Sequence, residues 1–185
     1  QMNGIASQSD GLLVLGATNI PWVLDSAIRR RFEKRVYIPL PDVRARARIF
    51  QLNLSKTAHT LTMADFKTLA ELTQGYSGHD VSTVVRDALM QPLAVLQEAT
   101  HFRYVGRPNP NNPSEILHNY FMEPCSPADP AGIEMTWMEL DPERLAEPVV
   151  ELKHMLRSVR RTKPSVNTAD IERHERFTME FGQEG

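Results

Sequence analysis

Apolar and polar residues follow two patterns along this chain, a strand-like pattern at the start and a helical one afterwards. Continuous apolar residues at 12–15 and 36–40 predict two strands, and the first is typical of a strand buried in a parallel sheet. Pro39 and Pro41 end the second strand, and Asp42 is placed to cap the helix that follows. The start of the chain is therefore predicted to be α/β and most of the remainder helical.

Two later helices have the sequence of a capping box, in which a hydroxyl and an acid three residues apart hydrogen-bond the first turn reciprocally. Thr62 pairs with Asp65 in one helix, and Ser77 pairs with Asp80 in the other. Pro92 is expected to kink the second helix or to end its first half. That helix has an apolar stripe with a period near 3.6, formed by Val81, Val84, Val85, Ala88, Leu89, Leu93 and Leu96.

Two more helices are predicted toward the C-terminal end. The first covers about 152–161 and stops near Pro164. The second begins at Asn167, has Asp170 in its first turn and ends at Gly182. The apolar side of this last helix has no partner within its own segment, so it must pack elsewhere; it consists of Ile171, His174, Phe177 and Phe181.

The segment between the helices, residues 101–148, breaks the helical pattern and holds eight of the 13 prolines. Strands are predicted at 101–105 and 132–140, with a long irregular loop between them. We expect a small β insertion whose exposed aromatic residues, among them Tyr120, Phe121 and Trp137, form a docking surface. An alternative interpretation is that Trp137 and Ile133 form the small core of the insertion itself.

Composition narrows the class of protein. The 185 residues suffice for one or two small domains, and 21 basic against 23 acidic residues give a net charge of −2 with no nucleic-acid signature. Cys125 is the only cysteine, which excludes an internal disulfide and favours a reducing compartment. No apolar run approaches the roughly 20 residues that a bilayer requires, and no signal peptide is visible. The start without methionine suggests a fragment.

The best candidates for chemistry lie near the start. Gly16-Ala17-Thr18-Asn19 places an amide at the end of a predicted strand, where it can orient water or bind a γ-phosphate. Arg29-Arg30-Arg31 offers clustered guanidinium groups, which suit the charge of a transferring phosphoryl group. A turn-forming asparagine and a solvated arginine face are the alternatives.

Other elements of catalysis are missing from the sequence. No G-x-x-x-x-G-K-[ST] loop and no apolar run followed by Asp-Glu is present, so the chain lacks the residues that bind Mg²⁺ and activate water. The histidines show no metal-ligand spacing, and no metal site is predicted. We therefore expect that the chain alone does not hydrolyse ATP.

In this order and spacing, the strand-end asparagine and the arginine triplet resemble the second region of homology of AAA ATPases. The resemblance implies that Asn19 is the sensor-one residue and that Arg30 and Arg31 are arginine fingers that reach the nucleotide of a neighbouring subunit, with Arg29 structural. It also implies that Asn53, Gly78 and His79 lie beside the adenine and ribose of ATP. No arginine occupies the usual second-sensor position.

Further segments resemble the vacuolar protein sorting AAA ATPases that disassemble ESCRT-III, including 16–22, 37–42, 87–92, 124–127 and 177–185. This resemblance implies the C-terminal part of an AAA module: an α/β fragment and a helical small subdomain with a β insertion and a C-terminal helix. The expected boundaries are 1–41 for the end of the large α/β subdomain, 42–100 and 149–166 for the small helical subdomain, 101–148 for the insertion and 167–185 for the terminal helix.

The same resemblance implies the cofactors and partners. ATP and Mg²⁺ are expected for the parent enzyme, with the Mg²⁺ ligands outside this chain. The expected partners are further copies in a hexameric ring, ESCRT-III subunits, and a Vta/LIP-type activator at the insertion. The expected location is cytoplasmic, with indirect recruitment to endosomal membranes.

Two other classes stay open on the sequence. One is a microtubule-severing AAA relative, against which the β insertion and the ending Phe181-Gly182-Gln183-Glu184-Gly185 argue. The other is a non-catalytic interaction module that uses the proline-rich insertion and the terminal helix as binding surfaces.

Overall fold

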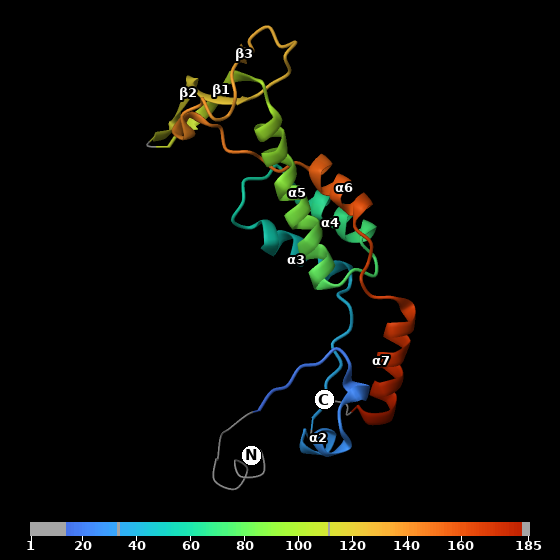
Figure 1. Cartoon of the computed structure of the whole chain (residues 1–185). Coiled ribbons are helices and arrows are strands. Elements are labelled where there is room, and N and C mark those ends of the chain that lie inside the picture. Colours follow the sequence, from blue (N-terminus) through green and yellow to red (C-terminus); the bar gives the residue numbers. More distant parts are fainter. Residues whose placement is uncertain (1–13, 33, 111, 183–185) are drawn as a thin grey trace. The chain divides into compact units, whose positions relative to one another are not determined.

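A computed structural model describes residues 14–32, 34–110 and 112–182 of the chain. The chain divides into two compact units, one formed by Gln1–Ile38 with Thr168–Gly185 and the other by Pro39–Asn167. The second unit contains the helices α3 to α6 and a small sheet, and the first contains α2 and α7 (Figure 1). The fold class is α/β, and within the described residues the sheet lies only in the insertion.

Four helices build the second unit: α3 (Val43–Leu54), α4 (Met63–Leu72), α5 (Gly78–Glu98) and α6 (Leu152–Arg161). The predicted starts of α3, α4 and α5 are confirmed, because Asp42 accepts a hydrogen bond from the Ala45 amide and both capping boxes are formed. Helix α5 continues through Pro92 and therefore does not end there. The caps supply partners for first-turn amides that have none inside a helix.

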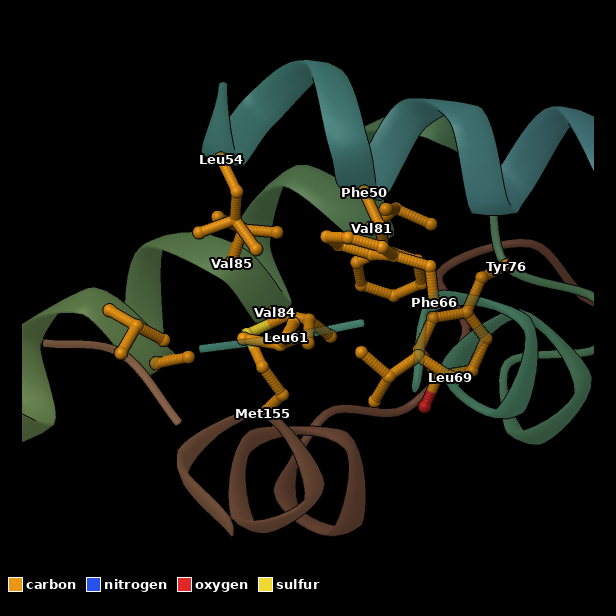
Figure 2. Packing of buried hydrophobic residues seen from close by; sticks show 12 residues of the cluster. Phe50, Leu54, Leu61, Phe66, Leu69, Tyr76, Val81, Val84, Val85 and Met155 are labelled. Carbon is orange, nitrogen blue, oxygen red and sulfur yellow. The ribbon is translucent and has the colours of Figure 1, made fainter. Parts of the chain in front are cut away.

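One apolar core joins these four helices (Figure 2). Each helix contributes residues that are fully or almost fully buried, such as Phe50 from α3, Leu69 from α4, Val84 from α5 and Met155 from α6. Burying one side chain of this size stabilises a fold by about 1.5–3 kcal/mol. The complete set is Phe50, Leu54, Leu61, Phe66, Leu69, Tyr76, Val81, Val84, Val85, Ala88, Val150 and Met155.

The insertion forms an antiparallel sheet with the strand order β2-β1-β3. Its strands are β1 (His101–Asn109), β2 (Asn112–Pro124) and β3 (Ile133–Glu134). The predicted strand at 101–105 is confirmed within β1. The prediction of a long irregular loop was wrong, since 13 of its residues form β2. Most of β2 is exposed on both faces, so no alternation of apolar and polar residues marked it as a strand.

The prolines in this hairpin occupy positions that a strand tolerates. Strand β3 pairs only with His101 and Phe102, so Pro108 lies where β1 has β2 as its sole partner among the described residues. Pro113 lies near the start of β2, which is an edge strand of this sheet. Because proline lacks an amide hydrogen, edges and unpaired sides are where strands accommodate it.

The prediction of a strand at 132–140 was wrong beyond its first residues. Strand β3 ends at Glu134, and a turn follows in which the Glu139 carboxylate accepts from both the amide and the hydroxyl of Thr136. This local side-chain pairing competes with an extended backbone. The turn leaves Trp137 exposed.

A second small core lies where the insertion meets the end of α5, and it is formed by Leu96 of α5 with Phe102, Met122 and Leu140 of the insertion. Trp137 and Ile133 are each 43% exposed and lie outside this core. The interpretation that these two residues form the insertion's core was therefore wrong.

After the insertion the chain returns to the helical unit at Val150. The Val150 amide donates to the Ala58 carbonyl and its carbonyl accepts from the Thr60 amide, both at 3.0 Å. These two hydrogen bonds tie the end of the insertion to the α3–α4 loop.

The first unit contains a 3-10 turn (Pro21–Val23), α2 (Ser26–Arg31) and α7 (Thr168–Phe181). The two strands predicted near the start were wrong for the residues that the structure describes, since 14–15 and 36–40 are not strands; Leu12 and Leu13 lie outside the described residues. A strand needs a neighbour to satisfy its backbone. The apolar residues stay exposed instead, to 82% for Leu15, 77% for Val36 and 85% for Ile38.

Helix α7 packs through aromatic contacts within this unit. The His174 ring lies 4.9 Å from Trp22 and 5.9 Å from Tyr37, and the Arg173 guanidinium lies 4.2 Å from the Trp22 ring. The helix prediction at this end is confirmed. Across the described residues, no helix combines the length and apolar character needed to cross a membrane.

Candidate functional site

The three arginines lie on α2, a six-residue helix that Asp25 caps by accepting from the Ala27 amide at 2.8 Å. Successive residues of a helix point about 100° apart, so the three side chains diverge. Arg29 is half-buried, with its guanidinium carbon 4.9 Å from the centre of the Phe181 ring. Arg30 and Arg31 are exposed. The structure thus distinguishes one packed arginine from two that are free to meet a partner.

Asn19 lies exposed in a bend between residues 14–18 and the 3-10 turn. The amide of the following Ile20 donates to the Thr18 hydroxyl at 3.1 Å, which shapes this bend. Among the described residues no hydrogen bond joins Asn19 to Arg30 or Arg31. The structure therefore does not link the three candidate catalytic residues by hydrogen bonds.

The residues expected to face a nucleotide base are brought together in part. Near the end of α3, the Asn53 amide donates to the Ser82 hydroxyl at 3.1 Å, and Ser82 donates to the Gly78 carbonyl at 3.0 Å. A Cβ at Gly78 would meet only the Ile49 side chain, at an ordinary 3.8 Å, so packing inside the unit does not require glycine there. His79 is exposed beside it. Ser82 was missed, although its place one turn after Gly78 on the same helix face is visible in the sequence.

The first turn of α5 is anchored on its buried side by Asp80. Its carboxylate accepts from the Ser77 amide at 2.8 Å, the Ser77 hydroxyl at 2.9 Å and the Ser165 amide at 3.2 Å. Burial by itself raises the pKa of Asp80, but the hydrogen bonds from Ser77 and Ser165 together outweigh it, and the pKa lies below its usual value. The Tyr76 hydroxyl donates to the Thr162 carbonyl, and burial raises the pKa of Tyr76. Both contacts tie the segment after α6 to this turn.

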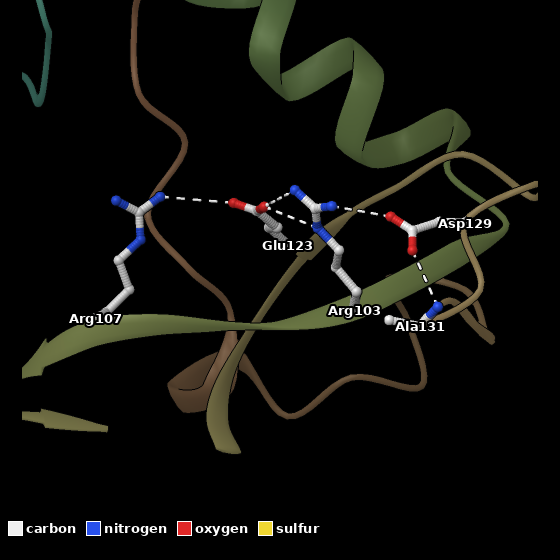
Figure 3. Close-up of polar contacts among 5 residues, drawn as sticks. All are labelled: Arg103, Arg107, Glu123, Asp129 and Ala131. Carbon is white, nitrogen blue, oxygen red and sulfur yellow. Dashed lines mark hydrogen bonds and ion pairs between the residues drawn. The ribbon is translucent and has the colours of Figure 1, made fainter. Parts of the chain in front are cut away.

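The insertion carries an ionic network on its sheet (Figure 3). Arg103 pairs with Glu123 on the facing strand at 2.8 Å and with Asp129 in the following loop at 2.9 Å. The Ala131 amide donates to Asp129 at 3.0 Å, which lowers the pKa of that carboxyl. Arg107 reaches the other oxygen of Glu123 at 3.7 Å. This network holds residues 126–132 against the sheet.

The network lies at the far end of α5 from the Gly78 turn (Figure 1). A helix of 21 residues is about 30 Å long, since each residue adds about 1.5 Å. The insertion is consequently separate from the candidate nucleotide contacts within this unit. Its outer surface carries stacked side chains, with the Arg144 guanidinium 5.8 Å from the Tyr104 ring and 5.9 Å from the Tyr120 ring.

No group of three or more His, Cys, Asp or Glu side chains in the described part of the chain is arranged to hold a metal ion. A cavity of about 190 Å³ opens between α2 and α7, where Trp22, Arg29 and Phe181 are part of its lining. That volume is below the range of about 300–1,000 Å³ typical of small-molecule sites.

Comparison with known proteins decides the family. Residues 122–182 match the model described as the Vps4 C terminal oligomerisation domain, and residues 1–40 match the ATPase family associated with various cellular activities (AAA). Vacuolar protein sorting-associated protein 4B of Mus musculus is 57% identical over 185 residues, which cover 100% of this chain and 41% of that protein. The chain belongs to the Vps4 family of AAA proteins.

Other relatives extend this result. Vacuolar protein sorting-associated protein 4 of Dictyostelium discoideum is 54% identical, again over 100% of this chain and 41% of that protein. The crystal structure of the FIGL-1 AAA domain in complex with ADP matches with a TM-score of 0.69 and 27% identity, covering 99% of this chain and 50% of that one. The chain thus spans about two fifths of the length of its Vps4 relatives. Asn19, Arg30 and Arg31 fall in the part that matches the AAA model.

Proposed function

We propose that this chain forms the C-terminal part of a Vps4-type ATPase ring that uses ATP hydrolysis to disassemble membrane-bound ESCRT-III polymers in endosomal sorting. The identity to vacuolar protein sorting proteins over the whole chain supports the process, and the match to an oligomerisation domain supports the ring. The complete protein acts in the cytoplasm and reaches endosomal membranes through its polymeric substrate. The observation that carries the proposal is the exposure of Arg30 and Arg31 beside the packed Arg29.

Arg30 and Arg31 act on the nucleotide of the neighbouring subunit in this proposal. Guanidinium groups stabilise the charge that spreads over a phosphoryl group during transfer, and an arginine supplied in trans accelerates such reactions by about 10³–10⁵-fold. Asn19 orients water or the γ-phosphate from within its own subunit. In a hexamer, each nucleotide site therefore receives Asn19 from its own subunit and Arg30 and Arg31 from the neighbouring subunit.

The chain's own contacts to ATP are Asn53, Gly78 and His79. Asn53 is linked to Gly78 through Ser82, and packing within the unit does not require a glycine at position 78. Both observations fit a helix start that a ligand approaches closely. The ADP named for the FIGL-1 AAA domain supports a nucleotide of this kind. Bound ATP with Mg²⁺ supplies the phosphoryl group, and the Mg²⁺ ligands come from parts of the complete protein outside this chain.

The test is made in the complete protein. Arg30→Ala and Arg31→Ala should abolish turnover and leave ATP affinity nearly unchanged, because they act on a neighbour's transition state. Arg157→Ala is the matched control, since it removes an exposed arginine from α6 and should change neither quantity. Equal losses of affinity and turnover would indicate a folding role. Mixing the Arg30→Ala protein with subunits that cannot hydrolyse ATP should restore part of the activity, and its absence in co-assembled rings would contradict action in trans.

A second function belongs to the insertion, which we propose to be the docking surface for a Vta/LIP-type activator that promotes ring assembly. Its place at the opposite end of α5 from the Gly78 turn and its exposed Tyr104, Tyr120 and Trp137 support this role. Replacing residues 103–146 with a short Gly-Ser linker should preserve basal ATPase activity and remove stimulation. Trp137→Ala, which spares the insertion's core, should weaken stimulation alone. Stimulation that survives the linker would place the docking site elsewhere.

A further inference from the structure

Helix α2 lacks the means to fix its own orientation. It has only six residues, none of them buried, and Asp25 caps a single end. Isolated helices shorter than about 12–15 residues are marginal in water, because nucleation costs more than a few hydrogen bonds return. The direction in which its arginines point must therefore be set by contacts outside the helix.

Among the described residues, the side-chain contact that meets this need joins Arg29 to Phe181 near the end of α7. The Arg29 guanidinium carbon lies 4.9 Å from the centre of the ring, a distance typical of a cation–π interaction. The Arg29 Nε atom is buried and makes no hydrogen bond, so packing and not a hydrogen bond holds this part of the side chain. Because residues of a helix are spaced by about 100°, fixing Arg29 also fixes Arg30 and Arg31.

Helix α7 is itself well held. Its middle contacts Trp22 and Tyr37 through His174, and Phe177 lies 5.1 Å from Phe181 one turn away. Phe181 nevertheless remains 39% exposed, so it is not a core residue in the usual sense. Its ring is placed to receive Arg29 more than to fill an apolar interior.

We propose that Phe181 is a positioning residue for the arginine fingers. Its ring holds Arg29, which sets the rotation of α2 and directs Arg30 and Arg31 toward the neighbouring nucleotide. This role rests on the proposed function, in which those two arginines act in trans. It also gives Arg29 a task distinct from that of its two neighbours.

The test compares Phe181→Ala with Met179→Ala in the complete protein. Met179 lies on the same helix, is 83% exposed and takes no part in the contact, so its replacement should change nothing. Phe181→Ala should lower kcat by about 10–100-fold with ATP affinity unchanged, since small misplacements of catalytic groups have effects of this size. Phe181→Tyr keeps the ring and should retain activity. Arg29→Gln, which leaves α7 intact, should reproduce the loss if Phe181→Ala fails to assemble.

Mixed rings separate positioning from a general structural defect. Phe181→Ala subunits mixed with subunits that keep their arginines but cannot hydrolyse ATP should regain activity, because intact fingers then serve the variant's nucleotide. Mixed with Arg30→Ala subunits they should not recover, because no subunit in that mixture then carries both Arg30 and Arg31 in the productive orientation. Recovery in neither mixture would mean a structural defect, and recovery in both would overturn the positioning role.

The two proposals fail in different ways. Full turnover in the Arg30→Ala protein would refute the arginine fingers themselves. Loss of turnover in Arg30→Ala together with normal turnover in Phe181→Ala and Arg29→Gln would leave the fingers in place and refute only the positioning role.

Discussion

Similar apolar residues are buried in one unit of this chain and exposed in the other. In the Pro39–Asn167 unit, four helices bury a common core that includes Leu54 and Leu69. In the other unit, none of the described residues is buried, and Leu15, Val36 and Ile38 are among the most exposed apolar residues of the chain. Hydrophobicity alone does not distinguish them. What differs is whether other described segments pack over each apolar face.

The largest expected effect comes from a matched pair of leucines. Leu69→Ala should destabilise the helical unit by about 2–5 kcal/mol, because it removes a fully buried side chain and leaves a cavity. Leu15→Ala should change the free energy of unfolding by no more than about 0.5 kcal/mol, since its side chain is already exposed. Urea denaturation followed by circular dichroism measures both. A large loss in Leu15→Ala would show that this leucine is buried in solution and would break the contrast between the units.

An intermediate effect is expected at Asp80, where a polar side chain supports the helical unit. Asp80→Asn should cost about 1–2 kcal/mol, because it weakens the capping of α5 and the bond from Ser165. The folded-state pKa of Asp80 lies below its unfolded value of about 3.9, so the carboxylate's contribution is present above that pH and is lost as the pH falls through the folded pKa.

The pH dependence sharpens this prediction. The difference in stability between the natural protein and Asp80→Asn should be largest at neutral pH and shrink below about pH 4. Chemical denaturation at pH 7, 5 and 3 measures it. A difference that stays constant across these values would mean that the charge of Asp80 contributes nothing and that only the shape of the side chain matters.

The smallest effect is expected in the ionic network of the insertion. Arg103→Ala should lower the Tm slightly, and the decrease should fade as NaCl is added, because exposed ion pairs are screened by salt. Lys67→Ala is the control, since it breaks a single exposed helical pair with Glu71 and should have even less effect. A large, salt-independent loss for Arg103→Ala would indicate that the network is needed for the sheet to form.

Features that depend on residues close together in the sequence could be predicted, and features that depend on distant residues could not. The capping boxes at Thr62 and Ser77 involve residues three positions apart, so the sequence displays them completely. Strand β2 depends on pairing with β1 across a hairpin, and Met122 is its only buried residue, so no alternating pattern distinguished it from a loop. The expected strands near the start failed because no neighbouring strand is present among the described residues.

The candidate site shows the same limit. Residue types and spacing were enough to single out Arg30, Arg31 and Gly78. The link from Asn53 to Gly78 through Ser82 joins two helices, and the stacking of Arg29 on Phe181 joins opposite ends of the chain. Neither contact leaves a periodic signal. The roles of all six candidate residues stay predictions: Asn19, Arg30, Arg31, Asn53, Gly78 and His79.

The hydrogen bonds of Val150 to Ala58 and Thr60 have a consequence for how this family can diverge. They attach the chain to the helical core at Val150, whatever conformation the residues between α5 and Val150 adopt. Lineages can therefore lengthen, shorten or rewrite the hairpin and its loop without altering most of the residues that fold the core. The insertion is a place where new surface can evolve independently of the helical core.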